Sequence, residues 1–190
     1  MRPGSRGYVT RMTVRSEGLV YEPNFLTEEE ERTLLAKIAA LDFDEIRMHG
    51  QAARRTAKHY GIAYDCDNPA APKPEEPLPG WLEPVRARVA ELAKVTPDDL
   101  VEALVQHYPP GAPIGWHRDA PKFGLVAGVS LASRARMRFQ RGKGEAREVT
   151  EVLLEPGSAY VLAGKARWSW QHSIPPVKED RYSITFRTLR

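Results

Sequence analysis

The stretch ALVQHYPPGAPIGWHRDAPKFGLVAGVSLA (residues 103–132) decides the fold, because apolar and polar residues alternate in short runs that Pro and Gly separate. A period of two residues is typical of β-strands, and Pro and Gly are typical of the turns between them. The alternation continues to the C-terminus in RMRFQR (136–141), EVTEVLLE (148–155), SAYVLAG (158–164), SWQHSI (169–174) and YSITFR (182–187). About eight successive strands predict a double-stranded β-helix, or jelly roll, and leave a β-sandwich of another topology open.

Two amphipathic helices precede these strands. Thr27 and Glu30 match a capping box, and leucine and isoleucine recur at helical spacing over the following turns. A second helix fits residues 83–94, with Pro84 in its first turn. We therefore expect a mainly β protein with flanking helices, in which the N-terminal helices pack on one outer face of the jelly roll.

The composition changes along the chain and predicts three parts of one compact domain. Residues 1–18 carry four arginines among Gly, Ser and Pro without periodicity, which is typical of a mobile basic arm. Residues 19–102 hold the two helices and, between them, an irregular segment that ends in the Pro-rich stretch 67–81, typical of a surface loop or lid. Residues 103–190 hold the predicted strands.

The overall composition excludes several classes of protein. The chain has 190 residues, of which 42% are hydrophobic, and a single core of this size buries about 70% of the surface that the unfolded chain exposes. No apolar run approaches the roughly 18 residues of a membrane span, and no signal segment is evident, so we expect a cytoplasmic monomer without membrane contacts. The single Cys66 excludes an internal disulfide and a Cys-rich zinc site. A net charge of +3 permits contact with nucleic acid without requiring it.

The motif GWHRDA (115–120) is the first candidate for chemistry. On a strand, His117 and Asp119 point to the same face, while Trp116 and Arg118 point to the other. An imidazole and a carboxylate at one point supply two ligands of the 2-His-1-carboxylate triad that holds non-haem Fe(II). Alone the pair is a weak signal, because short His/Asp pairs are usually solvated. The third ligand has to come from the remaining histidines, which are His49, His59, His107 and His172.

The last predicted strand, RYSITFR (181–187), is the second candidate. Period-2 alternation sets Arg181, Ser183, Thr185 and Arg187 on one face and three apolar or aromatic residues on the opposite, core face. Two guanidiniums on one face suit bidentate binding of a carboxylate. The more common alternative is that both arginines pair with surface carboxylates.

The order of these motifs resembles the AlkB family of Fe(II)- and 2-oxoglutarate-dependent dioxygenases. The resemblance covers roughly residues 18–190, in VQHYPPGAPIGWHRD (105–119), LLEPGSAYVLAGKARWSWQHSIP (153–175) and RYSITFR, with weaker support from RRTAKHYGIAYD (54–65). It implies a double-stranded β-helix in which His117, Asp119 and His172 hold Fe(II), with 2-oxoglutarate and O₂ as co-substrates. The chemistry it implies is centred on the iron, and no separate protein acid or base is assigned.

The resemblance also implies the residues that bind 2-oxoglutarate. Arg181 would bind the distal carboxylate, and Arg187 would lie near the co-substrate and the substrate. Gln106 and Tyr108 stand where the family has an Asn-x-Tyr pair, so the amide sits on a longer side chain. Ser183 stands where many members have Asn, which puts its contact with the co-substrate in doubt.

Two basic segments are candidates for binding nucleic acid. The first alternates cations, which suit phosphates, with flat rings, which suit stacking on bases, and by the resemblance it would be the nucleotide-recognition lid. It comprises Arg54, Arg55, Lys58, His59, Tyr60 and Tyr64. The alternative is a half-buried hairpin whose tyrosines fill the core. The second surrounds a predicted hairpin tip, in Arg134, Arg136, Arg138, Arg141, Lys143 and Arg147, and such arginines are often only solvated.

By the resemblance, the substrate is an alkylated nucleobase in single-stranded DNA, or one flipped out of a duplex, and RNA is a competitor. The leading hypothesis is DNA alkylation repair by oxidative demethylation or dealkylation, which releases succinate, CO₂ and an aldehyde. Some members place an acidic residue shortly after His-x-Asp to contact the damaged base, whereas this chain has Ala-Pro-Lys-Phe at 120–123. The alternatives are an oxygenase that modifies tRNA, another RNA or a protein side chain, a zinc hydrolase, and a non-catalytic RNA-binding module.

Overall fold

The structure is a computed structural model that describes residues 18–48, 51–63 and 73–190. Within these ranges no helix is long and apolar enough to cross a membrane. The predicted basic arm lies outside the described residues except for Gly18, as do His49, Tyr64 and Cys66.

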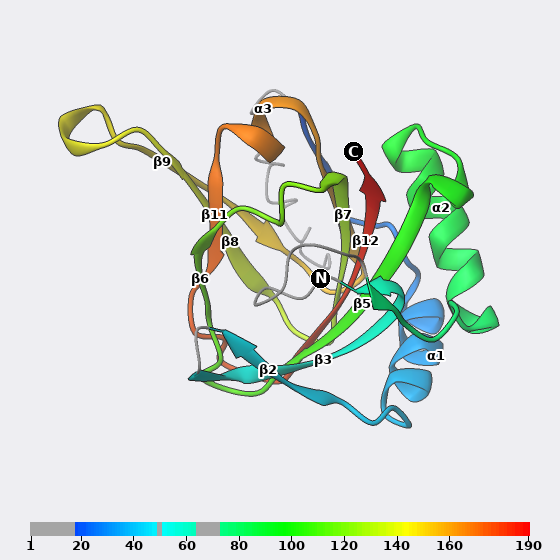
Figure 1. Cartoon of the computed structure of the whole chain (residues 1–190). Coiled ribbons are helices and arrows are strands. Elements are labelled where there is room, and N and C mark those ends of the chain that lie inside the picture. The colour runs from blue at the N-terminus through cyan, green and yellow to red at the C-terminus, as the bar shows by residue number, and fades with distance from the viewer. Residues whose placement is uncertain (1–17, 49–50, 64–72) are drawn as a thin grey trace, which may run out of the picture.

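Two antiparallel sheets face each other and form the predicted jelly roll (Figure 1). The larger sheet has the order β1-β10-β7-β12-β5-β3-β2, with β4 paired to β3. Its strands are β1 (Leu19–Glu22), β2 (Asp44–Met48), β3 (Gln51–Ala63), β4 (Lys73–Pro74), β5 (Leu100–Tyr108), β7 (Phe123–Leu131), β10 (Ser158–Leu162) and β12 (Arg181–Leu189). The smaller sheet has the order β6-β11-β8-β9, with β6 (Ile114–His117), β8 (Ala135–Arg141), β9 (Glu148–Leu154) and β11 (Gln171–Ile174).

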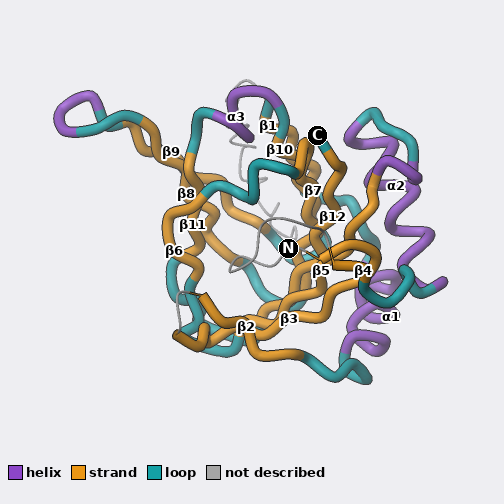
Figure 2. The backbone as a smooth tube through the Cα atoms, viewed as in Figure 1, coloured by secondary structure: helices purple, strands orange, loops and turns teal. Residues whose placement is uncertain are grey.

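Both predicted helices are present and cover the outer face of the larger sheet (Figure 2). Helix α1 (Glu28–Ile38) begins with the expected capping box: Thr27 Oγ1 accepts from the Glu30 amide at 3.2 Å, and Glu30 accepts from the Thr27 amide at 2.8 Å. Helix α2 spans Glu83–Ala93. Shorter helical turns are η1 (Gly80–Leu82), η2 (Pro97–Asp99), η3 (Gly144–Ala146) and α3 (Gly164–Trp168).

The structure corrects two details of the sequence analysis. The segment expected to be irregular contains β3, a strand of 13 residues that pairs with β5. Strand β6 ends at His117, so Asp119 lies in the following loop and not on the strand. The strands that precede β5 belong to the larger sheet together with β5, β7, β10 and β12, because β1 pairs with β10 and β3 with β5.

The larger sheet has an apolar outer face and a partly polar inner face. On the outer side, Leu34 and Ile38 of α1 and Val85 and Val89 of α2 pack in one buried cluster with Val105, Val129, Ile184 and Phe186 of the sheet. On the inner side, which faces the smaller sheet, a second cluster joins Val126 and Leu162 to Met137, Phe139, Val152 and Leu154. Burying this apolar surface contributes roughly 25 cal/mol per Å² to folding.

Strand register lines up polar residues across the inner face. Ser183 of β12 lies opposite Gln106 of β5 and Ser130 of β7, which in turn lies opposite Ser158 of β10. All four residues are buried. Buried polar groups cost free energy unless they are hydrogen-bonded, so a row of them is typical of a functional site and not of a core that only stabilises the fold.

Gly128 leaves room for the ring of Tyr160 between the sheets. A Cβ atom at Gly128 would lie 2.4 Å from Tyr160 Cζ and 2.5 Å from its hydroxyl oxygen. We expect Gly128→Ala to destabilise the protein by about 1–3 kcal/mol, because the ring or the strand has to shift. Urea denaturation measures this loss. Gly80→Ala is the control, since nothing lies within 4 Å of a Cβ there, and an equal loss in both variants would contradict the explanation.

Candidate metal and co-substrate site

The structure brings together the three predicted metal ligands. His117 ends β6 and lies opposite His172 of β11 in the strand register, and Asp119 follows two residues after His117. One donor atom from each residue lies within 4.8 Å of the other two. The two imidazole rings are 4.2 Å apart between centroids. The arrangement therefore offers two imidazole nitrogens and one carboxylate oxygen to one point in space.

The two histidines are held in the form that binds a metal. The Nδ1 atom of His117 lies 2.9 Å from the Gly115 carbonyl oxygen, which can only accept, so Nδ1 carries the proton and Nε2 keeps a lone pair. Burial lowers the pKa of His117, and it lowers the pKa of His172 to about 3. Both imidazoles are therefore neutral at ordinary pH, as metal coordination requires.

The two oxygens of Asp119 have different surroundings. Oδ1 accepts from Nε and Nη2 of Arg187, at 3.1 and 2.9 Å. Oδ2 is buried, has no hydrogen-bond partner in the described part of the chain, and lies 3.5 Å from Nε2 of His172. Burial acts to raise the pKa of Asp119, but the charge of Arg187 outweighs it and holds the pKa well below its usual range. A buried carboxylate oxygen without a donor, next to two neutral imidazoles, fits a divalent metal such as Fe(II).

Arg181 is a buried cation in the position predicted for binding a carboxylate. Its side chain is 1% exposed, its Nε donates to Ser130 Oγ at 3.2 Å, and its guanidinium lies 4.9 Å from the centre of the Tyr108 ring. Its Nη1 has no hydrogen-bond partner among the residues that the structure describes. A buried unpaired charge is costly, and an incoming carboxylate would relieve that cost. The 2-oxoglutarate assignment of Arg181 fits this environment.

The other residues predicted to contact 2-oxoglutarate lie on the same inner face. Gln106 is buried, and its amide oxygen accepts from the Tyr108 hydroxyl at 3.1 Å. Ser183 is buried opposite Gln106. Arg187 is engaged by two protein carboxylates, Asp119 and Glu102, so its predicted contact with the co-substrate would come in addition to these bonds. The roles of these four residues toward the co-substrate stay predictions.

Comparison with known proteins decides the family. A family model described as the 2OG-Fe(II) oxygenase superfamily matches residues 18–187. The chain belongs to this superfamily. The oxygenase is 33% identical to the tRNA (carboxymethyluridine(34)-5-O)-methyltransferase alkbh8 of Xenopus tropicalis, over 88% of this chain and 27% of that protein. It is 32% identical to the alpha-ketoglutarate-dependent dioxygenase alkB homolog 7, mitochondrial, of Mus musculus, over 85% of this chain and 68% of that one.

Further relatives place the oxygenase in the AlkB family. It is 31% identical to the alpha-ketoglutarate-dependent dioxygenase AlkB of Salmonella typhimurium, over 70% of this chain and 65% of that protein. The chain spans about a quarter of the length of the frog relative. The resemblance stated from the motifs is thus confirmed, and the oxygenase is an oxidoreductase that uses Fe(II), 2-oxoglutarate and O₂.

Solved structures confirm the fold. OsALKBH1 superposes with a TM-score of 0.64 at 16% identity, over 93% of this chain and 99% of that one. A prolyl-4-hydroxylase from Pseudomonas putida gives a TM-score of 0.63, also at 16% identity, over 91% and 93% of the two chains.

Three residues at the site of the oxygenase were missed by sequence reasoning. Glu102 is fully buried and accepts from Nη1 of Arg187 at 2.7 Å. Tyr160 lies on the inner face over Gly128, and burial raises the pKa of its hydroxyl to about 12, so it stays protonated. Arg167 is 2% exposed and is described next. Of the three, only Glu102 could have been found from the sequence, since its spacing of two residues from Leu104 places it on the same strand face as Gln106 and Tyr108.

Arg167 holds the loop that carries Asp119. From α3, its Nη2 donates to the carbonyl oxygens of Asp119, Ala120 and Phe123 at 3.2, 2.8 and 2.8 Å, and its Nε donates to that of Gly124 at 2.9 Å. Since the predicted ligand Asp119 lies in a loop, these four hydrogen bonds hold its backbone in place of the pairing that a strand would provide.

The predicted substrate residues on β3 of the oxygenase divide between its two faces. Arg55 and His59 lie on the inner face, where Arg55 acts on the pKa of His117 and His59 approaches Glu102. On the other face, Arg54 is exposed, and Lys58 pairs with Glu76 at 2.9 Å. Tyr60, also on this face, is 4% exposed and packs in the core under the helices. This agrees with the alternative prediction that tyrosines of this segment fill the core. Tyr64 lies outside the described residues.

Half of the cations in the second basic cluster pair with neighbouring carboxylates. Three of its arginines pair with glutamates on or next to β9, in Arg134–Glu155, Arg136–Glu151 and Arg141–Glu148. Arg138 and Arg147 lie 5.3 and 6.0 Å from the ring centre of Trp116 on the outer face of the smaller sheet. Its predicted role in contacting a nucleic-acid backbone stays a prediction.

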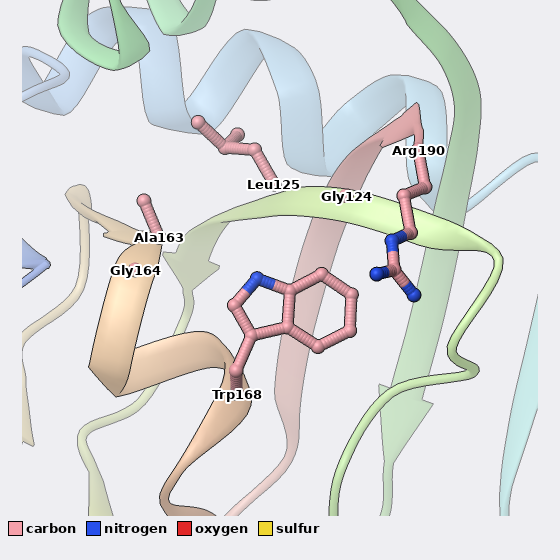
Figure 3. A pocket seen from close by; sticks show the side chains of 6 residues that line it. All are labelled: Gly124, Leu125, Ala163, Gly164, Trp168 and Arg190. Atoms are coloured by element: carbon pink, nitrogen blue, oxygen red, sulfur yellow. The ribbon is translucent and has the colours of Figure 1, made fainter.

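A surface hollow of about 400 Å³ lies apart from the metal ligands. It is lined by Gly124, Leu125, Ala163, Gly164, Trp168 and Arg190, between the start of β7, α3 and the end of β12 (Figure 3). The Arg190 guanidinium lies 5.2 Å from the centre of the Trp168 ring. None of the predicted ligand, co-substrate or substrate residues lines this hollow.

The low pKa values of the two histidines predict acid sensitivity of the metal-free oxygenase. The ordinary pKa of histidine is 6.5, so His117 and His172 of the unfolded chain bind protons below this pH. In the folded chain both pKa values are lower, and these protons bind only at a lower pH. Stability therefore falls as the pH decreases from 6.5 toward 4, by up to about 1.4 kcal/mol per pH unit for each histidine. Asp119 adds to this only near and below its ordinary pKa of 3.8. Urea denaturation in EDTA should show a shallower pH dependence for His172→Gln, and an unchanged slope would contradict the burial of that imidazole.

The environment of Arg181 predicts how the oxygenase distinguishes 2-oxo acids. Replacing Arg181 with Met should weaken 2-oxoglutarate binding roughly 10- to 100-fold, because a charge-assisted pair is lost. Binding of 2-oxobutyrate, which lacks the distal carboxylate, should be unchanged. Calorimetry on the Mn(II)-loaded protein measures both constants, with Arg32→Met on the outer surface as control. Equal weakening for both acids would show that Arg181 does not hold the distal carboxylate.

Proposed function

We propose that the oxygenase oxidatively dealkylates alkylated nucleobases, with DNA as the leading substrate. The observation that supports this most directly is the placement of β3, whose inner face presents Arg55 close enough to His117 to lower the pKa of that imidazole and His59 beside Glu102. The exposed Arg54 precedes them on the opposite face, where it is available to a phosphate. The relative alkbh8, which is named for an activity on tRNA, supports a nucleic-acid substrate over a protein side chain.

In this scheme each part of the site has a defined task. His117, Asp119 and His172 would hold Fe(II), and Arg181 would hold the distal carboxylate of 2-oxoglutarate from the opposite end of the inner face. Bound Fe(II) would supply the oxidising chemistry that couples conversion of 2-oxoglutarate and O₂ into succinate and CO₂ to insertion of oxygen into a C–H bond. A hydroxylated N-methyl group then leaves the base as formaldehyde.

The protein's own contribution is to position the co-substrate and to exclude water from the site. Arg181 and Tyr108 fix one end of the co-substrate, and the register between β12 and β5 places these two residues opposite each other. Buried apolar side chains, among them Phe139 and Val126, surround the site between the two sheets and limit the access of water. Oxygen insertion requires no acid or base from the protein, since one oxygen atom of O₂ ends in succinate, the other ends in the product hydroxyl together with the hydrogen of the C–H bond, and no net proton is released.

RNA, especially tRNA, is the second candidate. It is favoured by the similarity to alkbh8, which is named for an activity on a tRNA uridine, and that similarity covers 88% of this chain and 27% of that protein. The chain also has Ala-Pro-Lys-Phe at 120–123, without an acidic side chain to contact a damaged base. The part of the site that could discriminate between the two nucleic acids is therefore β3 and the segments around it.

The test is turnover on a substrate panel. Anaerobically loaded Fe(II) protein is mixed with 2-oxoglutarate, O₂ and methylated single-stranded DNA, duplex DNA or tRNA, and succinate and formaldehyde are quantified. We expect both products in equal amounts with methylated single-stranded DNA, and neither with Asp119→Ala. Products from tRNA alone would establish the second candidate. Succinate release that no nucleic acid stimulates would reject both.

A further inference from the structure

Glu102 is a buried charge that the proposed reaction does not use. It lies on β5, is 0% exposed, and stands opposite Arg187 of β12 in the strand register. Its Oε2 accepts from Nη1 of Arg187 at 2.7 Å. Its Oε1 has no hydrogen-bond partner in the described chain, and Nδ1 of His59 lies 3.4 Å from it. A carboxylate in this position costs several kcal/mol of desolvation, so its presence requires an explanation.

The partner of Glu102 is also the partner of a metal ligand. Arg187 donates through Nε and Nη2 to Oδ1 of Asp119 and through Nη1 to Glu102. A planar guanidinium that is held on two sides has little freedom to rotate. Glu102 therefore fixes the plane of Arg187, and Arg187 fixes the carboxylate of Asp119 with Oδ1 occupied and Oδ2 directed at the two imidazoles.

Charge gives Glu102 a second effect on the metal. A guanidinium next to a metal ligand repels a divalent cation and weakens the ligand as a donor. With Glu102, the buried group of two carboxylates and one guanidinium keeps a net negative charge, and without it the two remaining charges cancel. In a partly desolvated interior this net negative charge strongly attracts a divalent cation a few ångströms away.

We propose that Glu102 is a positioning residue for the metal site, which acts through Arg187 to make Asp119 a single-oxygen ligand and to keep the site attractive to a divalent cation. It is not a ligand itself. The proposal rests on the metal assignment of His117, Asp119 and His172, and it is independent of which nucleic acid is the substrate. His59 extends the same chain of contacts to β3, so the strand proposed to meet the substrate is two contacts away from Arg187.

The test compares metal binding by Glu102→Gln with that of the wild type. Glutamine keeps the size and the hydrogen bond to Arg187 but loses the charge. Co(II) is titrated into the metal-free protein without O₂, and the dissociation constant and the visible d–d spectrum are recorded. We expect binding to weaken roughly 10- to 100-fold, as for other residues that orient metal ligands, together with a changed spectrum. Glu83→Gln, which loses an exposed pair with Arg86 on α2, should match the wild type.

A merely structural role for Glu102 predicts a different outcome. In that case Glu102→Gln lowers the melting temperature of the metal-free protein but leaves the Co(II) constant within twofold and the spectrum unchanged, and the proposal is overturned. Should the glutamine variant not fold, Glu102→Asp keeps the charge and shortens the reach. Its Co(II) spectrum should then change, and an unchanged spectrum and constant would likewise overturn the proposal. Absence of Co(II) binding by the wild type would instead reject the metal assignment itself.

Discussion

The bridge from Glu102 through Arg187 to Asp119 is the interaction on which the metal site depends, because it joins three segments that are distant in the sequence. Asp119 lies in a loop, where backbone pairing does not orient its side chain. Arg187 holds its carboxylate, and Arg167 holds the backbone of the same loop through four carbonyl oxygens. Two arginines thus give a loop residue the order that a strand gives to His172. This is how a ligand outside regular structure is fixed well enough to bind a metal.

The two faces of the larger sheet have different roles: the outer face stabilises the fold, and the inner face carries the polar residues of the site. The outer face packs against α1 and α2 through aliphatic and aromatic side chains, while the inner face buries Arg181 and Glu102 and partly buries Arg187. Buried charges stabilise a fold poorly even when they are paired, and Nη1 of Arg181 has no partner in the described chain. The apolar outer core therefore has to offset the cost of the polar interior. A protein with this division is expected to gain stability when its ligands bind, because binding satisfies groups that folding leaves incomplete.

The sequence predicted the strands of the C-terminal half and both long helices, and the resemblance to the AlkB family named the metal ligands. Period-2 alternation predicted β5–β12, and the capping box predicted the first residue of α1. The missed features depend on register, which one sequence does not show. Glu102 became part of the site only because β5 and β12 pair with Glu102 opposite Arg187. Strand β3 was overlooked since polar residues occupy both of its faces, and Arg167 was overlooked since its partners are backbone carbonyls, which leave no trace in residue types.

The two faces of β3 also limit how its residues can meet a nucleic acid. In the sequence, cations and rings alternate from Arg54 to Tyr60 and resemble one continuous binding surface. The strand separates them: Arg55 and His59 face the metal ligands, whereas Tyr60 packs in the core beneath the helices. A base near the metal can therefore contact only the first pair, and the Tyr60 ring contributes to binding by holding the strand in place. Since His59 also approaches Glu102, a substrate that displaces His59 would act on the same group that orients Arg187. Recognition and metal binding then share one buried chain of contacts.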